Sequence, residues 1–342
     1  MLSRARTARG FLGAATAALF VVSSLTAVWM LARDEDPEPP EPAAVSPDPA
    51  PEATREAIPE TPPDTGARGE ATGEAKVVIS ERGVVLPVRS AEAGGYRVST
   101  PCSKTALVQG GRPVPGAAVV LDPGHGGAED GAVGPNGLTE KAVNLAVARH
   151  AQAALERQGV STVLTRTADY RMTLGARAEV AKALGPRAFV SVHHNSEPDG
   201  PRPGPGTETF YQVQSPSSKR LAGLVYEEVV KALSAYQVAW VADRDAGAKF
   251  RRNSRGGDYY GILRQTAGVT AVLAELAFIS NPPEARLLAR PDVQQVEGEA
   301  VARGIVRFLT TSDPGSGYVT PYPRDEPAGP GGGGAGCVDP PL

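Results

Sequence analysis

From residue 117 to residue 309 the chain alternates short apolar, β-branched runs with longer amphipathic stretches, and this alternation restricts its fold more than any other feature. Strands alternating with helices are typical of an open α/β sheet. The predicted strands are 118–121, 161–165, 189–192, 208–213 and 270–276. The predicted helices are 139–158, 173–184, 217–235 and 292–309, with Thr139, Thr173 and Ser217 as caps. The expected fold is α/β, an open twisted, mostly parallel sheet flanked by helices.

Three shorter β-branched runs, at 76–80, 83–88 and 96–100, precede this region. So short a piece cannot hold a core alone, and we therefore expect a small β-rich segment over 76–115 that packs on the adjacent domain. This larger domain is predicted at 116–310. Within it, residues 240–257 combine five basic side chains with three glycines and are predicted to be a long solvated loop. The alternative is a rim that meets a carboxylate-bearing ligand.

Two tracts of biased composition flank the predicted domains. Residues 37–63 contain 10 prolines, and residues 313–342 contain 7 prolines and 8 glycines. Such segments bury too little apolar surface to offset the entropy lost on ordering. We predict a disordered Pro/Glu-rich linker at 34–75 and a Pro/Gly-rich tail at 311–342.

The amino terminus has the pattern of an export signal. Three arginines, Arg4, Arg6 and Arg9, precede an uncharged run over residues 10–32. This length favours an uncleaved membrane anchor, and a cleaved signal peptide within residues 1–33 is the alternative. Arginines before the run predict that the rest of the chain lies outside. The expected location is the outer face of the cytoplasmic membrane or the cell wall space, anchored or secreted.

Charge and cysteine content exclude several classes of protein. The net charge is -3 and no basic stripe alternates with aromatic residues, so nucleic acid is not an expected partner. Two cysteines are too few for a disulfide-rich scaffold or a cysteine-based zinc cluster. An exported chain can form disulfides, and Cys102 and Cys337 are predicted to pair. Two unpaired small apolar side chains are the alternative.

Imidazoles follow two of the predicted strands. His125 stands in a turn of three glycines after the strand at 118–121, and His193 and His194 end the strand at 189–192. Ligands of open α/β sheets bind at the carboxyl ends of the strands, so a metal pair is plausible there. Neighbouring strand residues point to opposite faces, so only one of His193 and His194 is expected to reach the site. A phosphate-binding loop is disfavoured because the turn lacks the P-loop lysine.

Two carboxylates are the other candidates. Glu140 opens the first predicted helix beside the same sheet edge, where it could be a third metal ligand or simply favour the helix amino terminus. Glu275 interrupts an apolar strand, where a charge is costly unless it is paired or functional. The fourth histidine, His150, lies on the apolar face of its helix and is predicted to be a packing residue.

Four ordered blocks resemble one family. They are Leu121–Gly127, Gly137–Lys141, Ser191–Asn195 and Glu275–Asn281, and together they are similar to the zinc-dependent N-acetylmuramoyl-L-alanine amidases of the Amidase_3 family. The resemblance extends over about residues 117–309. It implies a peptidoglycan hydrolase that cleaves the amide between N-acetylmuramic acid and the L-alanine of the stem peptide.

The resemblance also implies roles for individual residues. His125, Glu140 and His193 would hold one Zn²⁺ per catalytic domain, with His194 as a neighbour, and Glu275 would be the catalytic carboxylate. Arg166 and Asp169 resemble an arginine turn of the family and are expected to be structural or at the substrate rim. The alternatives are a zinc peptidase that cuts within the stem peptide and a wall-binding protein on a degenerate amidase scaffold.

Overall fold

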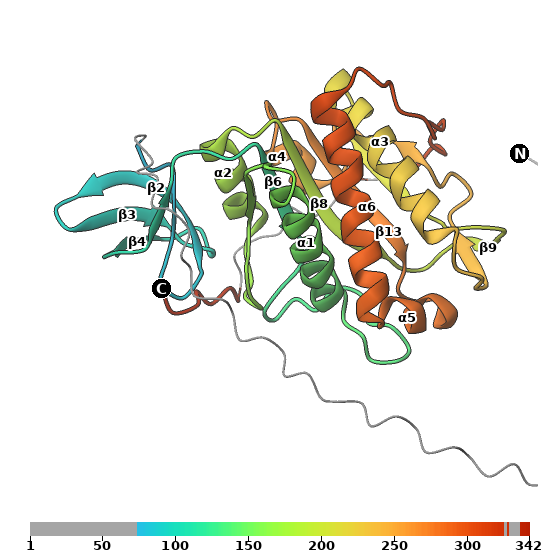
Figure 1. The fold of residues 1–342 in the computed structure, drawn as a ribbon, viewed down its shortest axis with the longest axis horizontal. Helices are drawn as coiled ribbons and strands as arrows, with labels where there is room; N and C mark the ends of the chain where they lie inside the picture. Colours follow the sequence, from blue (N-terminus) through green and yellow to red (C-terminus); the bar gives the residue numbers. More distant parts are fainter. Residues whose placement is uncertain (1–73, 325–326, 328–335) are drawn as a thin grey trace, which may run out of the picture. The chain divides into compact units, whose positions relative to one another are not determined.

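The structure, a computed structural model, describes residues 74–324, 327 and 336–342. Its centre is a six-stranded sheet in the order β12-β10-β13-β8-β6-β7 (Figure 1). These strands are β6 Val119–Pro123, β7 Thr162–Leu164, β8 Ala188–Asn195, β10 Glu208–Tyr211, β12 Ala248–Lys249 and β13 Ala271–Phe278. All pairs are parallel except β10 with β13. The predicted α/β fold with a mostly parallel sheet is therefore confirmed.

Helices cover both faces of this sheet. They are α1 Glu140–Glu156, α2 Leu174–Leu184, α3 Pro216–Leu233, α4 Gly261–Gln265, α5 Pro282–Leu288 and α6 Pro291–Thr310. Successive side chains of a strand point to opposite faces of the sheet. In β6, Val119 and Leu121 pack against α1, α3 and α6, whereas Val120 packs against α2 and α4. Apolar side chains thus line both faces of the sheet.

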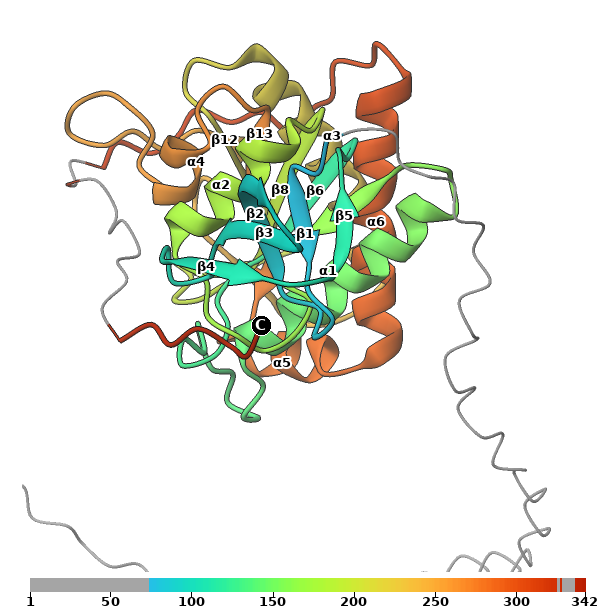
Figure 2. The same ribbon diagram turned by 90° about the vertical axis from the view of Figure 1, so that its left-hand side faces the viewer.

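A second sheet of five antiparallel strands lies against α2. Its order is β4-β3-β2-β1-β5, formed by β1 Val77–Ile79, β2 Val85–Glu92, β3 Gly95–Ser99, β4 Thr105–Val108 and β5 Arg112–Val114. Figure 2 looks onto this small sheet. Buried Val85 and Leu86 share one core with Val180 of α2, so the small sheet completes the apolar cover of that helix. Without α2 it would expose this apolar face.

Several local predictions need correction. Residues 240–257 are not one solvated loop, because they contain β12 and also β11 Trp240–Ala242, which pairs with β9 Gly200–Arg202. The cap of α3 is Ser215 rather than Ser217. Thr139 precedes α1 but makes no capping hydrogen bond through its side chain, whereas Thr173 accepts one from the Ala176 amide.

The carboxyl-terminal segment lies along the edge of the large sheet. Tyr318 forms a parallel bridge with Ala248 of β12, and the Val319 amide donates to the Ala248 carbonyl at 3.1 Å. The predicted disulfide between Cys102 and Cys337 is present. It joins the tail to the turn between β3 and β4.

The predicted signal at 1–33 lies outside the described residues, and so does the predicted linker at 34–75 except for residues 74 and 75. Within the part of the chain that the structure describes, no helix combines the length and the apolar character needed to cross a bilayer.

Candidate metal centre

The turn that carries His125 is held by two buried arginines. His125 directly follows Gly124 at the end of β6 and has a φ of 60°, a left-handed conformation that is uncommon outside glycine and concentrates at functional sites. Arg166 donates to the carbonyls of Pro123 and Gly124, each at 3.0 Å. Arg177 donates to the carbonyl of His125 at 2.6 Å. These bonds fix the strained turn, so Arg166 lies beneath the site rather than at its rim.

Asp169 supports the next part of the same loop. Its carboxylate accepts from the Gly127 amide at 2.7 Å and pairs with Lys141 of α1 at 3.0 Å. It therefore ties the glycine turn to the first turn of α1.

His193 reaches the same place from the neighbouring strand, β8. A Cβ at position 124 would lie 2.1 Å from Cε1 of His193, so only glycine leaves room for the ring. His194, the next residue, has a side chain that is fully buried, and its Nδ1 faces Asn144 of α1 at 2.8 Å. The structure thus groups His193, and not His194, with His125.

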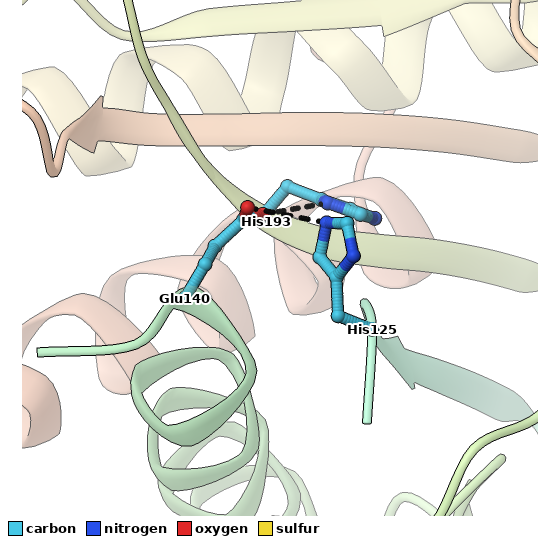
Figure 3. A group of neighbouring side chains, drawn as sticks. All are labelled: His125, Glu140 and His193. Atoms are coloured by element: carbon cyan, nitrogen blue, oxygen red, sulfur yellow. Dashed lines mark hydrogen bonds and ion pairs between the residues drawn. The ribbon is translucent and has the colours of Figure 1, made fainter. Parts of the chain in front are cut away.

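Glu140, at the start of α1, contacts both imidazoles through its carboxylate (Figure 3). Its Oε2 is 3.1 Å from Nε2 of His125, and its Oε1 is 2.9 Å from Nδ1 of His193. The Ala132 amide also donates to Oε2 at 2.9 Å. Burial raises the pKa of the Glu140 carboxyl, but hydrogen bonds from His125 and His193 outweigh it and hold this pKa well below its usual range.

These three residues fit a metal ion by the chemistry of their donors. One atom from each of His125, Glu140 and His193 lies within 4.8 Å of the others, and two imidazoles with one carboxylate are a ligand set that zinc takes in catalytic sites. Gly131 leaves room for the Glu140 side chain, because a Cβ at this position would lie 2.5 Å from Oε2 of Glu140.

Glu275 lies beside this group on β13. It is in register with His193 of the adjacent strand, and its Oε2 is buried without a hydrogen-bond partner among the described residues. Burial raises the pKa of Glu275 well above its usual range, and the nearby charges of Glu140 and Glu208 add to the effect. A carboxylate whose pKa is raised in this way is a stronger base than an exposed one, so Glu275 is a candidate proton acceptor.

Comparison with known proteins identifies the family. Residues 119–307 match the Amidase_3 family, described as N-acetylmuramoyl-L-alanine amidase. The chain belongs to this family. It is thus a hydrolase of the predicted class.

The chain is also similar to individual proteins, one of which is itself named as an amidase. The uncharacterized protein YqiI of Bacillus subtilis is 36% identical over 207 residues, which are 60% of this chain and 88% of that protein. The germination-specific N-acetylmuramoyl-L-alanine amidase of Bacillus subtilis is 30% identical over 213 residues, 58% of this chain and 82% of that one. Among solved structures, Cwp6 from Clostridium difficile is 28% identical with a TM-score of 0.51, over 59% of this chain and 32% of that chain.

The amidase also contains a buried charged cluster that the sequence did not reveal. Glu208 of β10 is in register with Glu275, and its Oε2 accepts from Asn195 at 2.8 Å. Lys249 of β12 is fully buried and pairs with Glu208 and, at 2.7 Å, with Asp245. Glu208 was missed because it stands between Thr207 and Thr209 and does not interrupt an apolar run as Glu275 does. Lys249 was missed because its basic, glycine-containing surroundings predict a solvated loop.

A second group of carboxylates, Glu208, Asp243 and Asp245, has its oxygens close together. The ammonium of Lys249 already lies against two of them. This group therefore has its own cation in the protein and is not a second metal centre of the amidase.

Proposed function

We propose that the amidase acts with one zinc ion held by His125, Glu140 and His193, and that Glu275 is its catalytic carboxylate. The observation that carries the proposal is the convergence of two imidazoles and a buried carboxylate from three separate parts of the chain. Beside them, on the adjacent strand, Oε2 of Glu275 has no hydrogen-bond partner among the described residues. When bound, zinc would lower the pKa of a water molecule and polarise the scissile carbonyl.

The protein's own residues carry the proton transfers. Glu275 takes the proton of the attacking water and passes it to the leaving amine of L-alanine. Burial raises the pKa of Glu275 well above its usual range, which strengthens this carboxylate as a base toward the proton of water. Arg166 and Arg177 hold the His125 turn in place, so the imidazole is oriented before any ligand arrives.

The proposed substrate is peptidoglycan, cleaved between N-acetylmuramic acid and the L-alanine of the stem peptide. This polymer lies outside the cytoplasmic membrane, which agrees with the export pattern at residues 1–33 and with the disulfide of Cys102 and Cys337. We infer that the enzyme works on the outer face of the membrane or in the cell wall space. Residues 10–32 would anchor it if they are not cleaved.

Digestion of purified peptidoglycan by the full chain tests this function. We expect soluble stem peptides with L-alanine at their amino termini, identified by mass spectrometry, and we expect that a chelator abolishes their release and added zinc restores it. Cuts inside the stem peptide would instead identify a peptidase. Intact wall that retains bound protein would identify a wall-binding protein.

A further inference from the structure

A buried polar chain leads away from Glu140 into the layer of helices. Asn144, one turn along α1, donates from Nδ2 to Oε1 of Glu140 at 3.2 Å, and its own Oδ1 lies 2.8 Å from Nδ1 of His194. Beyond the ring, Nε2 of His194 lies 3.4 Å from Oε1 of Glu297 on α6. Asn144, His194 and Glu297 are all buried.

The chemistry of these groups fixes the direction of each bond. A carboxylate only accepts, so the amide of Asn144 must turn its NH₂ group toward Glu140. Its carbonyl oxygen then faces His194, and that nitrogen of the ring must carry a hydrogen. Because Nδ1 of His194 donates to Oδ1 of Asn144, the amide is held with its NH₂ group toward Glu140. This is the orientation that stabilises the Glu140 carboxylate.

Glu297 lies on the far side of the ring. Helix α6 lies close against α1 at this point, since a Cβ at Gly298 would be 2.6 Å from Cβ of His150. This close approach brings the neighbouring Glu297 over His194. Neither carboxylate oxygen of Glu297 has a hydrogen-bond partner among the described residues, and burying such a group is costly. Nε2 of His194, which is likewise without a hydrogen-bond partner among the described residues, lies 3.4 Å from Oε1 of Glu297.

We propose that His194, backed by Glu297, is a positioning residue for the metal centre. It fixes the Asn144 amide, and Asn144 in turn fixes the carboxylate of Glu140. The backbone amide of His194 donates to the same Oε1 atom at 3.2 Å, so one residue restrains this ligand in two ways. The inference rests on the proposed function, in which Glu140 holds zinc.

Zinc affinity tests the proposal without relying on turnover. Dissociation constants of the full chain are measured by competition with a chromophoric chelator for wild type, His194→Ala, Asn144→Ala and the double variant. Loss of a group that supports a metal ligand weakens binding about 10-fold or more. We expect this loss in each single variant and no further loss in the double variant, because both act through the same bond to Glu140.

Two further variants separate positioning from packing. His194→Asn keeps an N–H near the position of Nδ1 and should restore most of the affinity lost in His194→Ala. His150→Ala removes a second histidine from the contact between α1 and α6, away from Glu140, so it should lower thermal stability but leave zinc affinity unchanged.

The outcomes are distinguishable. Wild-type affinity in a folded His194→Ala variant, or losses that add in the double variant, would overturn the positioning role alone. A wild-type chain that binds no zinc, or that binds it equally well after His125→Ala, would overturn the proposed function together with this inference.

Discussion

At the scale of single residues, Asp122 shows how one buried carboxylate holds the floor of the site. It belongs to β6 and is 1% exposed. Its oxygens accept from Thr165 at 2.5 Å and Ser191 at 2.7 Å, and it pairs with Arg177 at 2.7 Å. Burial raises the pKa of Asp122, but Arg177 and these hydroxyls outweigh burial and hold the pKa below its usual value.

Replacing this carboxylate should destabilise the protein. We expect Asp122→Asn to lower the free energy of unfolding at pH 7 by about 3 kcal/mol, because it leaves the charge of Arg177 buried without its partner. Chemical denaturation measures this change. The exposed pair of Asp292 with Arg290 offers a control, and Asp292→Asn should cost less than about 1 kcal/mol.

Asp122→Asn should also make the free energy of unfolding depend less on acid pH. The folded-state pKa of Asp122 lies below its unfolded value, so its contribution is complete above about pH 4 and is lost as the pH falls through the folded-state pKa. Stability of Asp122→Asn should therefore fall less between about pH 5 and about pH 2 than that of wild type. An equal fall in both proteins would contradict the assignment.

At the scale of elements, the edge strand β12 and its neighbour β10 depend on buried charge. Lys249 brings an ammonium from β12 to Glu208 of β10, and its Nζ also lies 5.1 Å from the ring centre of Phe210. Tail residue Arg324 pairs with Asp245, the other partner of Lys249, at 3.1 Å. The tail and the sheet edge thus share one charged network beside Glu275.

Lys249→Met tests this network. We expect a loss of about 3 kcal/mol in the free energy of unfolding, because Glu208 would be left buried without its cation. Lys231 on α3 is exposed, and Lys231→Met should change stability by less than about 0.5 kcal/mol. Equal effects of the two substitutions on thermal denaturation would rule out a structural role for the buried pair.

Strands and helices whose position follows from the local pattern of apolar residues could be predicted from the sequence. The five predicted strands and four predicted helices of the large domain are all present, because hydrophobic alternation reports burial directly. Pairing that depends on distant residues was not predicted. The antiparallel β10 and the two-residue β12 are stabilised by partners elsewhere in the chain, and β12 has too few residues for a period.

The same distinction applies to the site. Alternation along β8 indicated that His193 and His194 point apart, but the residues alone did not decide which of them faces His125. That choice depends on α1, where Glu140 lies next to His193 and Asn144 lies next to His194. The contact with Glu297 depends further on how α6 packs against α1.

At the scale of the whole molecule, the disulfide joins distant parts of the described chain. Cys102 and Cys337 are separated by 235 positions. The tail is also held by Asp339, which accepts from the Cys102 amide at 2.8 Å, and by Leu342, which packs on the core shared by the small sheet and α2. The last residues therefore belong to the folded body.

Reduction should weaken this connection. A disulfide that closes so long a loop contributes about 2–5 kcal/mol, mainly by restricting the unfolded chain. We expect a reductant to lower the Tm of wild type, and Cys102→Ser with Cys337→Ser to show the lower Tm with or without reductant. A wild-type Tm that does not respond to reductant, with thiol labelling showing both cysteines free, would contradict the pairing.

The central claim is that His125, Glu140 and His193 hold zinc while Glu275 performs proton transfer. The most direct test measures zinc content and peptide release on the same samples of wild type, His193→Ala and Glu275→Gln. We predict one zinc per chain and activity in wild type, neither in His193→Ala, and zinc without activity in Glu275→Gln. Full zinc and activity in His193→Ala, or undiminished peptide release by Glu275→Gln, would contradict the account.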